Sequence, residues 1–194
     1  MRFEDGSVMR LYRQTVEDFA LFDGMELDQA AMKKLQSAAE EMSAKMRAVR
    51  IVSVTNVSKK DLQKRLVAKG ESLQSAQNAV AWMEDLNLID DRKTAEFIVQ
   101  RCGFKGYGIA RAKQALYEKR IPKEFWEDAL ENYPDQTETI LRFLRERASE
   151  LSEPKSKKRV IDALLRKGHS YGDIRRALEE LSLDADLFGE EFYG

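Results

Sequence analysis

The chain has 194 residues, of which 33 are lysine or arginine and 34 are aspartate or glutamate, so its formal net charge is −1. It contains one histidine and one cysteine, whereas histidine-centred triads and most protein metal sites need several such residues. No apolar stretch approaches the roughly 20 residues that span a bilayer, and the polar start from Met1 to Asp5 does not resemble a signal peptide. We therefore expect a cytoplasmic, non-enzymatic protein without metal, cofactor or membrane partner.

The first 42 residues form a leader to the rest of the chain. Alternating apolar residues from Val8 to Arg13 predict a short strand or extended segment. Thr15 is predicted to cap a short helix, because an acidic residue stands three positions later. Asp28 is the next predicted N-cap, and a long helical pattern follows it. Ser43 leaves open whether this pattern is one helix or two.

A short pattern then occurs three times: a leucine, two residues, a lysine and a break. The copies are Leu66–Gly70, Leu116–Arg120 and Leu164–Gly168, about fifty residues apart, which is the period of an internal repeat. A repeat of this length must stack on its neighbours to bury its apolar face. The sequence predicts a mainly α fold, an elongated array of three tandem three-helix repeats. The predicted boundaries are leader 1–42, repeat one 43–89, repeat two 90–133, repeat three 134–183 and acidic tail 184–194.

Residues at predicted helix ends support this division. Ser58, Ser72 and Ser170 are placed to cap helices, and Pro122 suits the first position of another. Gly70 can take the left-handed conformation that ends a helix. Arg120 stands at the same position in repeat two, where a side chain costs on the order of 1 kcal/mol, so we expect another form of turn there.

Basic residues are concentrated in the second half of the chain. Residues 155–176 contain eight basic and two acidic residues, whereas residues 177–194 contain six acidic residues and no basic one. Cations next to an aromatic ring such as Tyr107 can neutralise phosphates and stack on bases. The candidate residues for contact with a filament or DNA are Arg101, Lys105, Arg111, Lys113, Lys155, Lys157, Lys158, Arg159, Arg166, Lys167, Arg175 and Arg176.

Other chemistry-bearing residues have simpler structural interpretations. His169 follows the break of repeat three, where we expect an exposed turn, and Cys102 is expected to be a half-buried structural thiol. Asp90 and Asp91 suit the N-cap and first turn of a helix better than a metal site. The glycines at 103, 106 and 108 do not match a phosphate-binding loop and are read as a connection between helices.

The order of several segments resembles the RecX family of regulatory proteins. These segments are Ser58–Leu62, Leu66–Gly70, Leu86–Asp91, Ala95–Ile98, Gly106–Ile109 and Leu116–Ile121, with Gly24–Asp28 resembling the region that precedes the repeats in some members. Arg120 departs from the usual glycine. Residues 54–57 lack the arginine that the family tends to place there.

The resemblance implies a partner and an activity. RecX proteins modulate the RecA recombinase, so the chain would bind the RecA filament, and single- or double-stranded DNA directly or through it. It would inhibit recombinase, ATPase and co-protease activities in DNA repair and the SOS response. Separately, an unpaired array with capped ends suggests a monomer. A helical DNA-binding or transcriptional regulator is the alternative, although the helix after Pro122 is too acidic to enter a DNA groove. A pure protein scaffold is a third.

Overall fold

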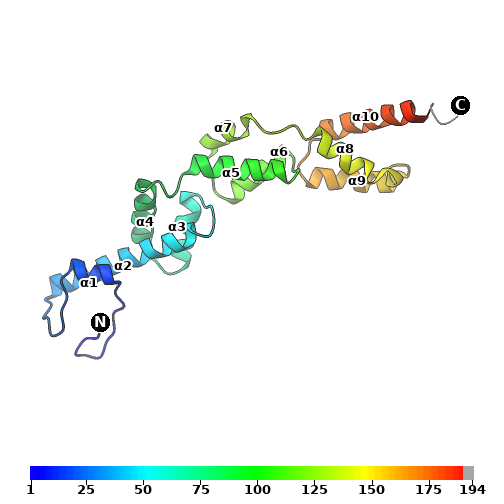
Figure 1. The fold of residues 1–194 in the computed structure, drawn as a ribbon. Helices are drawn as coiled ribbons and strands as arrows, with labels where there is room; N and C mark the ends of the chain where they lie inside the picture. Colours follow the sequence, from blue (N-terminus) through cyan, green and yellow to red (C-terminus); the bar gives the residue numbers. More distant parts are fainter. Residues whose placement is uncertain (190–194) are drawn as a thin grey trace. The chain divides into compact units, whose positions relative to one another are not determined.

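A computed structural model describes the backbone of residues 1–189 and the side chains of residues 1–181. Its described residues are helical apart from turns, loops and one isolated bridge that joins Arg2 to Val8, so the mainly α prediction is confirmed (Figure 1). The chain divides into two compact units, Met1–Asp91 and the part from Arg92 onward. Across the described residues, no helix is both long and apolar enough to cross a bilayer.

The first unit contains four helices: α1 (Arg13–Asp18), α2 (Gln29–Val52), α3 (Lys59–Ala68) and α4 (Leu73–Asp85). Its core lies where α2, α3 and α4 meet, and it includes Ala48, Leu66 and Met83. The predicted caps are present, because the side chains of Asp28, Ser58 and Ser72 accept hydrogen bonds from backbone N–H groups of the next turn. A serine or aspartate oxygen at this place satisfies an amide that the helix itself leaves unpaired.

The structure corrects one prediction for the first two helices and answers a question that the sequence left open. Thr15 does not cap a helix, since α1 begins at Arg13 and Thr15 is buried inside it. Ser43 does not interrupt α2, which is continuous over 24 residues. The Ser43 hydroxyl instead donates a hydrogen bond to Glu71 Oε1 at 2.9 Å, and Arg47 Nε lies 2.6 Å from the same oxygen. These contacts attach the turn after α3 to α2.

The second unit contains the remaining helices. They are α5 (Asp91–Phe104), α6 (Ile109–Glu118), a 3₁₀ turn (Lys123–Phe125), α7 (Trp126–Glu131), α8 (Thr137–Arg145), a second 3₁₀ turn (Ala148–Glu150), α9 (Pro154–Arg166) and α10 (Tyr171–Gly189). Pro122 precedes the first 3₁₀ turn, so the predicted α-helix begins four residues later, at Trp126. Helix α10 continues into the segment predicted as an acidic tail, whose side chains lie outside the described residues.

This unit has two separate cores. One is formed by Ala95, Val99, Leu116 and Ile121, with Trp126 and Tyr133 packed against it. The other includes Leu141, Leu144, Val160, Leu164 and Ile174 from α8, α9 and α10. Each middle helix therefore supplies a leucine of the repeated pattern to the core of its own three-helix group.

The breaks in all three repeats share one turn. The carbonyls of Leu66, Leu116 and Leu164 accept hydrogen bonds from the backbone N–H five residues later, at 3.2, 3.0 and 3.2 Å. This is the Schellman arrangement, which needs a left-handed residue just past the helix. Gly70 and Gly168 supply it with φ of 93° and 90°, and Arg120 adopts the same region with φ of 56°. The expectation of another turn at Arg120 was wrong. Burial of the following Ile121 favours this geometry despite the side chain.

Candidate nucleic-acid interface

The strongest concentration of predicted cations lies on helix α9. Pro154 stands in the first turn of this helix, where its missing N–H leaves no hydrogen bond unmade. Val160 and Leu164 face the core, so helical periodicity puts the opposite side in water. Four exposed cations share that side within about 100° of arc: Lys155, Lys158, Arg159 and Arg166. We call these four residues the α9 face.

The neighbouring Lys157 is also exposed but points elsewhere. At 100° per residue it falls close to the line of Leu164, on the core-facing side of α9 near the start of the helix. Asp162 is half-buried and is the one acidic residue within the arc of the α9 face. The face therefore carries a clear positive excess, which favours an anionic partner.

The cations of the α9 face differ from several other predicted cations in whether they have a partner within the protein. Considering described side chains only, no member of the α9 face makes an ion pair. By contrast, Arg175 Nε lies 3.1 Å from Glu179 Oε1, Arg176 pairs with Asp173, and Arg111 Nη1 lies 3.3 Å from Glu118 Oε1. Lys167 is half-buried with its Nζ 4.5 Å from the centre of the Phe143 ring. These four cations are already engaged within the protein.

Three predicted cations of repeat two surround Cys102. Burial raises the pKa of this thiol, while the positive charges of Arg111, Lys105 and Arg101 act in the opposite direction. The thiol is buried, more fully than predicted, which fits a structural residue. Lys113 lies about 160° around α6 from Arg111, so it does not join them. The four candidate cations of repeat two are thus three near Cys102 and one separate lysine.

An exposed aromatic residue was missed by the sequence reasoning. Tyr107 is only half-exposed, and its carbonyl accepts a 2.6 Å hydrogen bond from the hydroxyl of Tyr133, whose pKa burial raises to about 12. Phe104, at the end of α5 between Arg101 and Lys105, is 92% exposed. The sequence feature that could have indicated this exposure is the position of Phe104 between a glycine and a lysine at a predicted helix end. Phe104 is the ring best placed for stacking beside these cations.

The glycines at 103, 106 and 108 are explained by close packing. A Cβ on Gly103 would lie 2.7 Å from Pro134 Cγ, one on Gly106 would lie 2.7 Å from Thr139 Cγ2, and one on Gly108 would lie 2.0 Å from the Gly168 carbonyl oxygen. The Gly108 N–H donates to the Lys167 carbonyl at 2.9 Å, and Ala110 N–H donates to the Gly168 carbonyl at 3.2 Å. The loop brings repeats two and three together backbone to backbone.

His169 is buried at this junction, contrary to the prediction of an exposed turn residue. It is 5% exposed, and its Nε2 donates a hydrogen bond to the Gly106 carbonyl at 3.1 Å. Burial lowers the pKa of its imidazole, and the positive charge of Lys167 lowers it further. Sequence reasoning missed this because the contact joins residues 63 positions apart.

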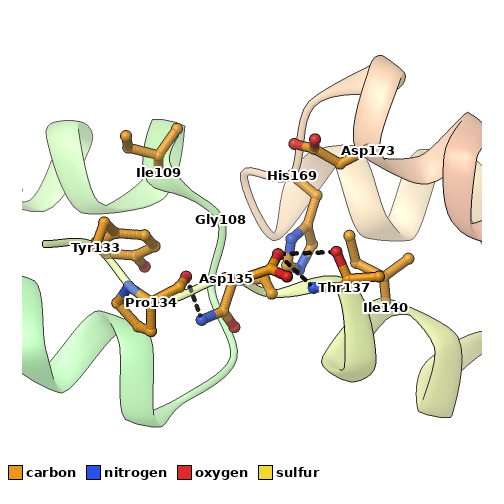
Figure 2. Close-up of a pocket in the computed structure, with 10 residues that line it drawn as sticks. Gly108, Ile109, Tyr133, Pro134, Asp135, Thr137, Ile140, His169 and Asp173 are labelled. Carbon is orange, nitrogen blue, oxygen red and sulfur yellow. Dashed lines mark hydrogen bonds between the residues drawn. The ribbon is translucent and has the colours of Figure 1, made fainter.

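A small cavity of about 210 Å³ lies beside the histidine. Figure 2 shows His169, Asp135, Ile140 and Asp173 among the residues that line it. Hydrogen bonds from Thr137 and Ser170 lower the pKa values of Asp135 and Asp173 respectively. Within the described part of the chain, no group of three or more His, Cys, Asp or Glu side chains is arranged to hold a metal ion.

The acidic pair stands at the start of α5, with Asp91 in the first turn as predicted, and Asp91 also makes a contact that was not predicted. Asp91 is buried, and its Oδ1 accepts a hydrogen bond from the backbone N–H of Lys59 at 2.9 Å. The carboxylate therefore satisfies an amide in the first turn of α3. Burial raises the pKa of Asp91, with Lys59 acting against that effect.

Comparison with known proteins agrees with this arrangement. No protein-family model matches the sequence. The chain is 24% identical over 168 residues to regulatory protein RecX of Clostridium perfringens, covering 83% of this chain and 76% of that protein. It is 26% identical over 149 residues to regulatory protein RecX of Vibrio campbellii, covering 75% and 95%. A crystal structure of RecX from Lactobacillus salivarius superposes with a TM-score of 0.65 at 27% identity, covering 75% of this chain and 99% of that one.

The chain is similar in sequence and fold to RecX regulatory proteins. A second RecX crystal structure matches with a TM-score of 0.69 at 19% identity, over 92% of this chain and 91% of the other, and it supports the same fold. These RecX relatives are named regulatory proteins.

Proposed function

We propose that this chain binds the filament that RecA recombinase forms on DNA and restrains its strand exchange, ATP hydrolysis and co-protease activity. The similarity to RecX proteins supports the partner, and the α9 face is the observation that supports contact with a polyanion. Its four cations are exposed and, among described side chains, unpaired. Each can therefore neutralise a phosphate without first breaking an ion pair. Protein contacts would give selectivity for the recombinase, and phosphate contacts would add salt-sensitive affinity.

The proposed mechanism is occupation of the filament by several modest contacts. An array of helical repeats presents separate surfaces, and the binding of one raises the effective concentration of the next. The acidic residues of α7 and its preceding turn would suit basic protein, whereas the α9 face suits phosphate or acidic protein. A chain held across successive subunits would oppose the rearrangements that the filament needs for its activities. This role requires no catalytic residue.

A titration into filament ATP hydrolysis tests the proposal. RecA is assembled on single-stranded DNA, hydrolysis is followed as the chain is added, and binding to the same DNA without RecA is measured in parallel. We expect inhibition at concentrations well below those that coat bare DNA. DNA binding without any effect on hydrolysis would instead favour a general DNA-binding regulator. Absence of both effects would leave a protein scaffold.

A further inference from the structure

The three middle helices, α3, α6 and α9, expose an apolar side chain at the same place. Each repeated pattern begins with a leucine that is at most 1% exposed: Leu66, Leu116 and Leu164. The next residue along the helix points about 100° away. That residue is Val67 in repeat one, Tyr117 in repeat two and Leu165 in repeat three.

These three side chains are in water. Val67 is 42% exposed, Tyr117 is 68% exposed and Leu165 is 41% exposed. One exposed apolar residue on a helix needs no explanation, because much protein surface is apolar. Three exposed apolar residues at equivalent positions of three repeats do need an explanation. The next position along each helix is also exposed, yet it holds alanine in repeat one, glutamate in repeat two and arginine in repeat three. Apolar character is kept at one exposed position only, and the packing of each repeat does not require it.

Exposed lysines accompany the apolar residue on each helix. On α3, Lys60 and Lys64 stand seven and three residues before Val67, so all three share one side. On α6, Lys113 stands four residues before Tyr117, and on α9 Lys158 stands seven before Leu165. As far as the described side chains go, these four lysines make no ion pair. Each middle helix thus combines an apolar side chain with positive charge.

We propose that these three surfaces are one docking module repeated, and that each takes the same site on successive identical subunits of a protein polymer. Positive charge beside an apolar side chain fits an acidic protein surface that has an apolar recess. Nucleic acid fits less well, because valine and leucine offer no ring on which bases can stack. Identical sites at regular intervals are a property of polymers built from one subunit. The proposal rests on the function proposed above, in which that polymer is the recombinase filament.

Glutamine substitutions of the apolar residues test the module. Val67→Gln, Tyr117→Gln and Leu165→Gln are made singly and together in the full chain, since glutamine is a good helix former without charge. Leu86→Gln and Leu88→Gln are the matched controls, because both leucines are comparably exposed and both follow α4, outside the three middle helices. Binding of end-labelled protein to filaments locked with a non-hydrolysable ATP analogue is measured by fluorescence anisotropy.

We expect each single substitution to weaken filament binding by about five- to tenfold, the triple variant by about a hundredfold or more, and the controls by less than about twofold. Binding to bare single-stranded DNA should stay within about twofold of wild type for every variant. If wild type binds filaments and the variants match it, the module is wrong while the proposed function stands. Loss at one position alone, or parallel loss on bare DNA, also overturns the module. Failure of the wild type to bind filaments overturns the proposed function itself.

Discussion

At the level of single residues, Gly108 and Gly168 hold the joint between repeats two and three. Their backbones approach so closely that neither position has room for a Cβ. Gly168 also takes the left-handed conformation that ends α9, so it satisfies two separate requirements. Gly70 occupies the same position in repeat one with nothing within 4 Å of its missing Cβ. Gly70 and Gly168 therefore share a backbone conformation and differ in how closely their surroundings pack.

That difference predicts unequal effects of alanine. Gly70→Ala should lower stability by about 1 kcal/mol, the cost of a left-handed alanine. Gly168→Ala should cost that amount and roughly 1–3 kcal/mol more, because its Cβ would lie 2.4 Å from the Arg111 nitrogen. Denaturant unfolding followed by circular dichroism would compare both variants with wild type. Equal losses would contradict the close contact.

His169 predicts a pH dependence of stability. Burial lowers its pKa in the folded protein below the ordinary histidine value of 6.5, so between the two pKa values the unfolded chain binds more protons than the folded one. The free energy of unfolding should therefore rise as pH increases through this window and level off above 6.5. As the chain has one histidine, its imidazole proton resonance can be followed by NMR without assignment. A midpoint at or above 6.5 would contradict the burial.

At the level of elements, the α9 face is the feature most open to direct test. Lys158→Glu/Arg159→Glu should reduce inhibition of filament ATP hydrolysis by about tenfold or more, because two attractive contacts become repulsive. The helix should remain folded, since both side chains are exposed. Lys33→Glu/Lys34→Glu on α2 makes the same change of charge at exposed positions in the first unit. Equal effects of the two double variants would show that only net charge matters.

Features fixed by neighbouring residues were predicted well from sequence. The caps at Asp28, Ser58, Ser72 and Ser170 depend on an oxygen and an amide within one turn. By contrast, Ser43 was ambiguous because its partner, Glu71, lies 28 residues away. The turn at Arg120 followed the burial of Ile121 and not the local preference for glycine.

The candidate site was predictable only in part, for the same physical reason. A run of cations on α9 can be read from periodicity, so the exposed face was found. The contact of Lys167 with Phe143 is tertiary, so sequence could not show it. Arg175 and Arg176 instead pair within α10, four and three residues from their acidic partners, which is a local signal that the sequence reasoning did not use. The exposure of Phe104 and burial of His169 likewise depend on how repeats two and three pack.

At the level of the whole molecule, the salt dependence of binding should distinguish phosphate contacts from protein contacts. Phosphate contacts release counterions, so binding to bare single-stranded DNA should weaken steeply between 50 and 200 mM salt. Removing two phosphate contacts in the Lys158→Glu/Arg159→Glu protein should reduce the slope of log affinity against log salt by about 1.4. Filter binding across a salt series would measure both slopes. An unchanged slope would mean that these two residues do not contact phosphate.

The backbone contact at Gly168 also limits how such an array could grow. Suppose a second copy of residues 90–133 were inserted before residue 134, giving a chain of four repeats. The inserted copy would meet the original Gly108 with the residue that repeat two carries at the break, which is Arg120. Its Cβ would collide with backbone where glycine now fits. A duplicated repeat would therefore not pack at its first new joint unless that arginine became glycine. The steric requirement at this joint thus opposes the addition of repeats by simple duplication.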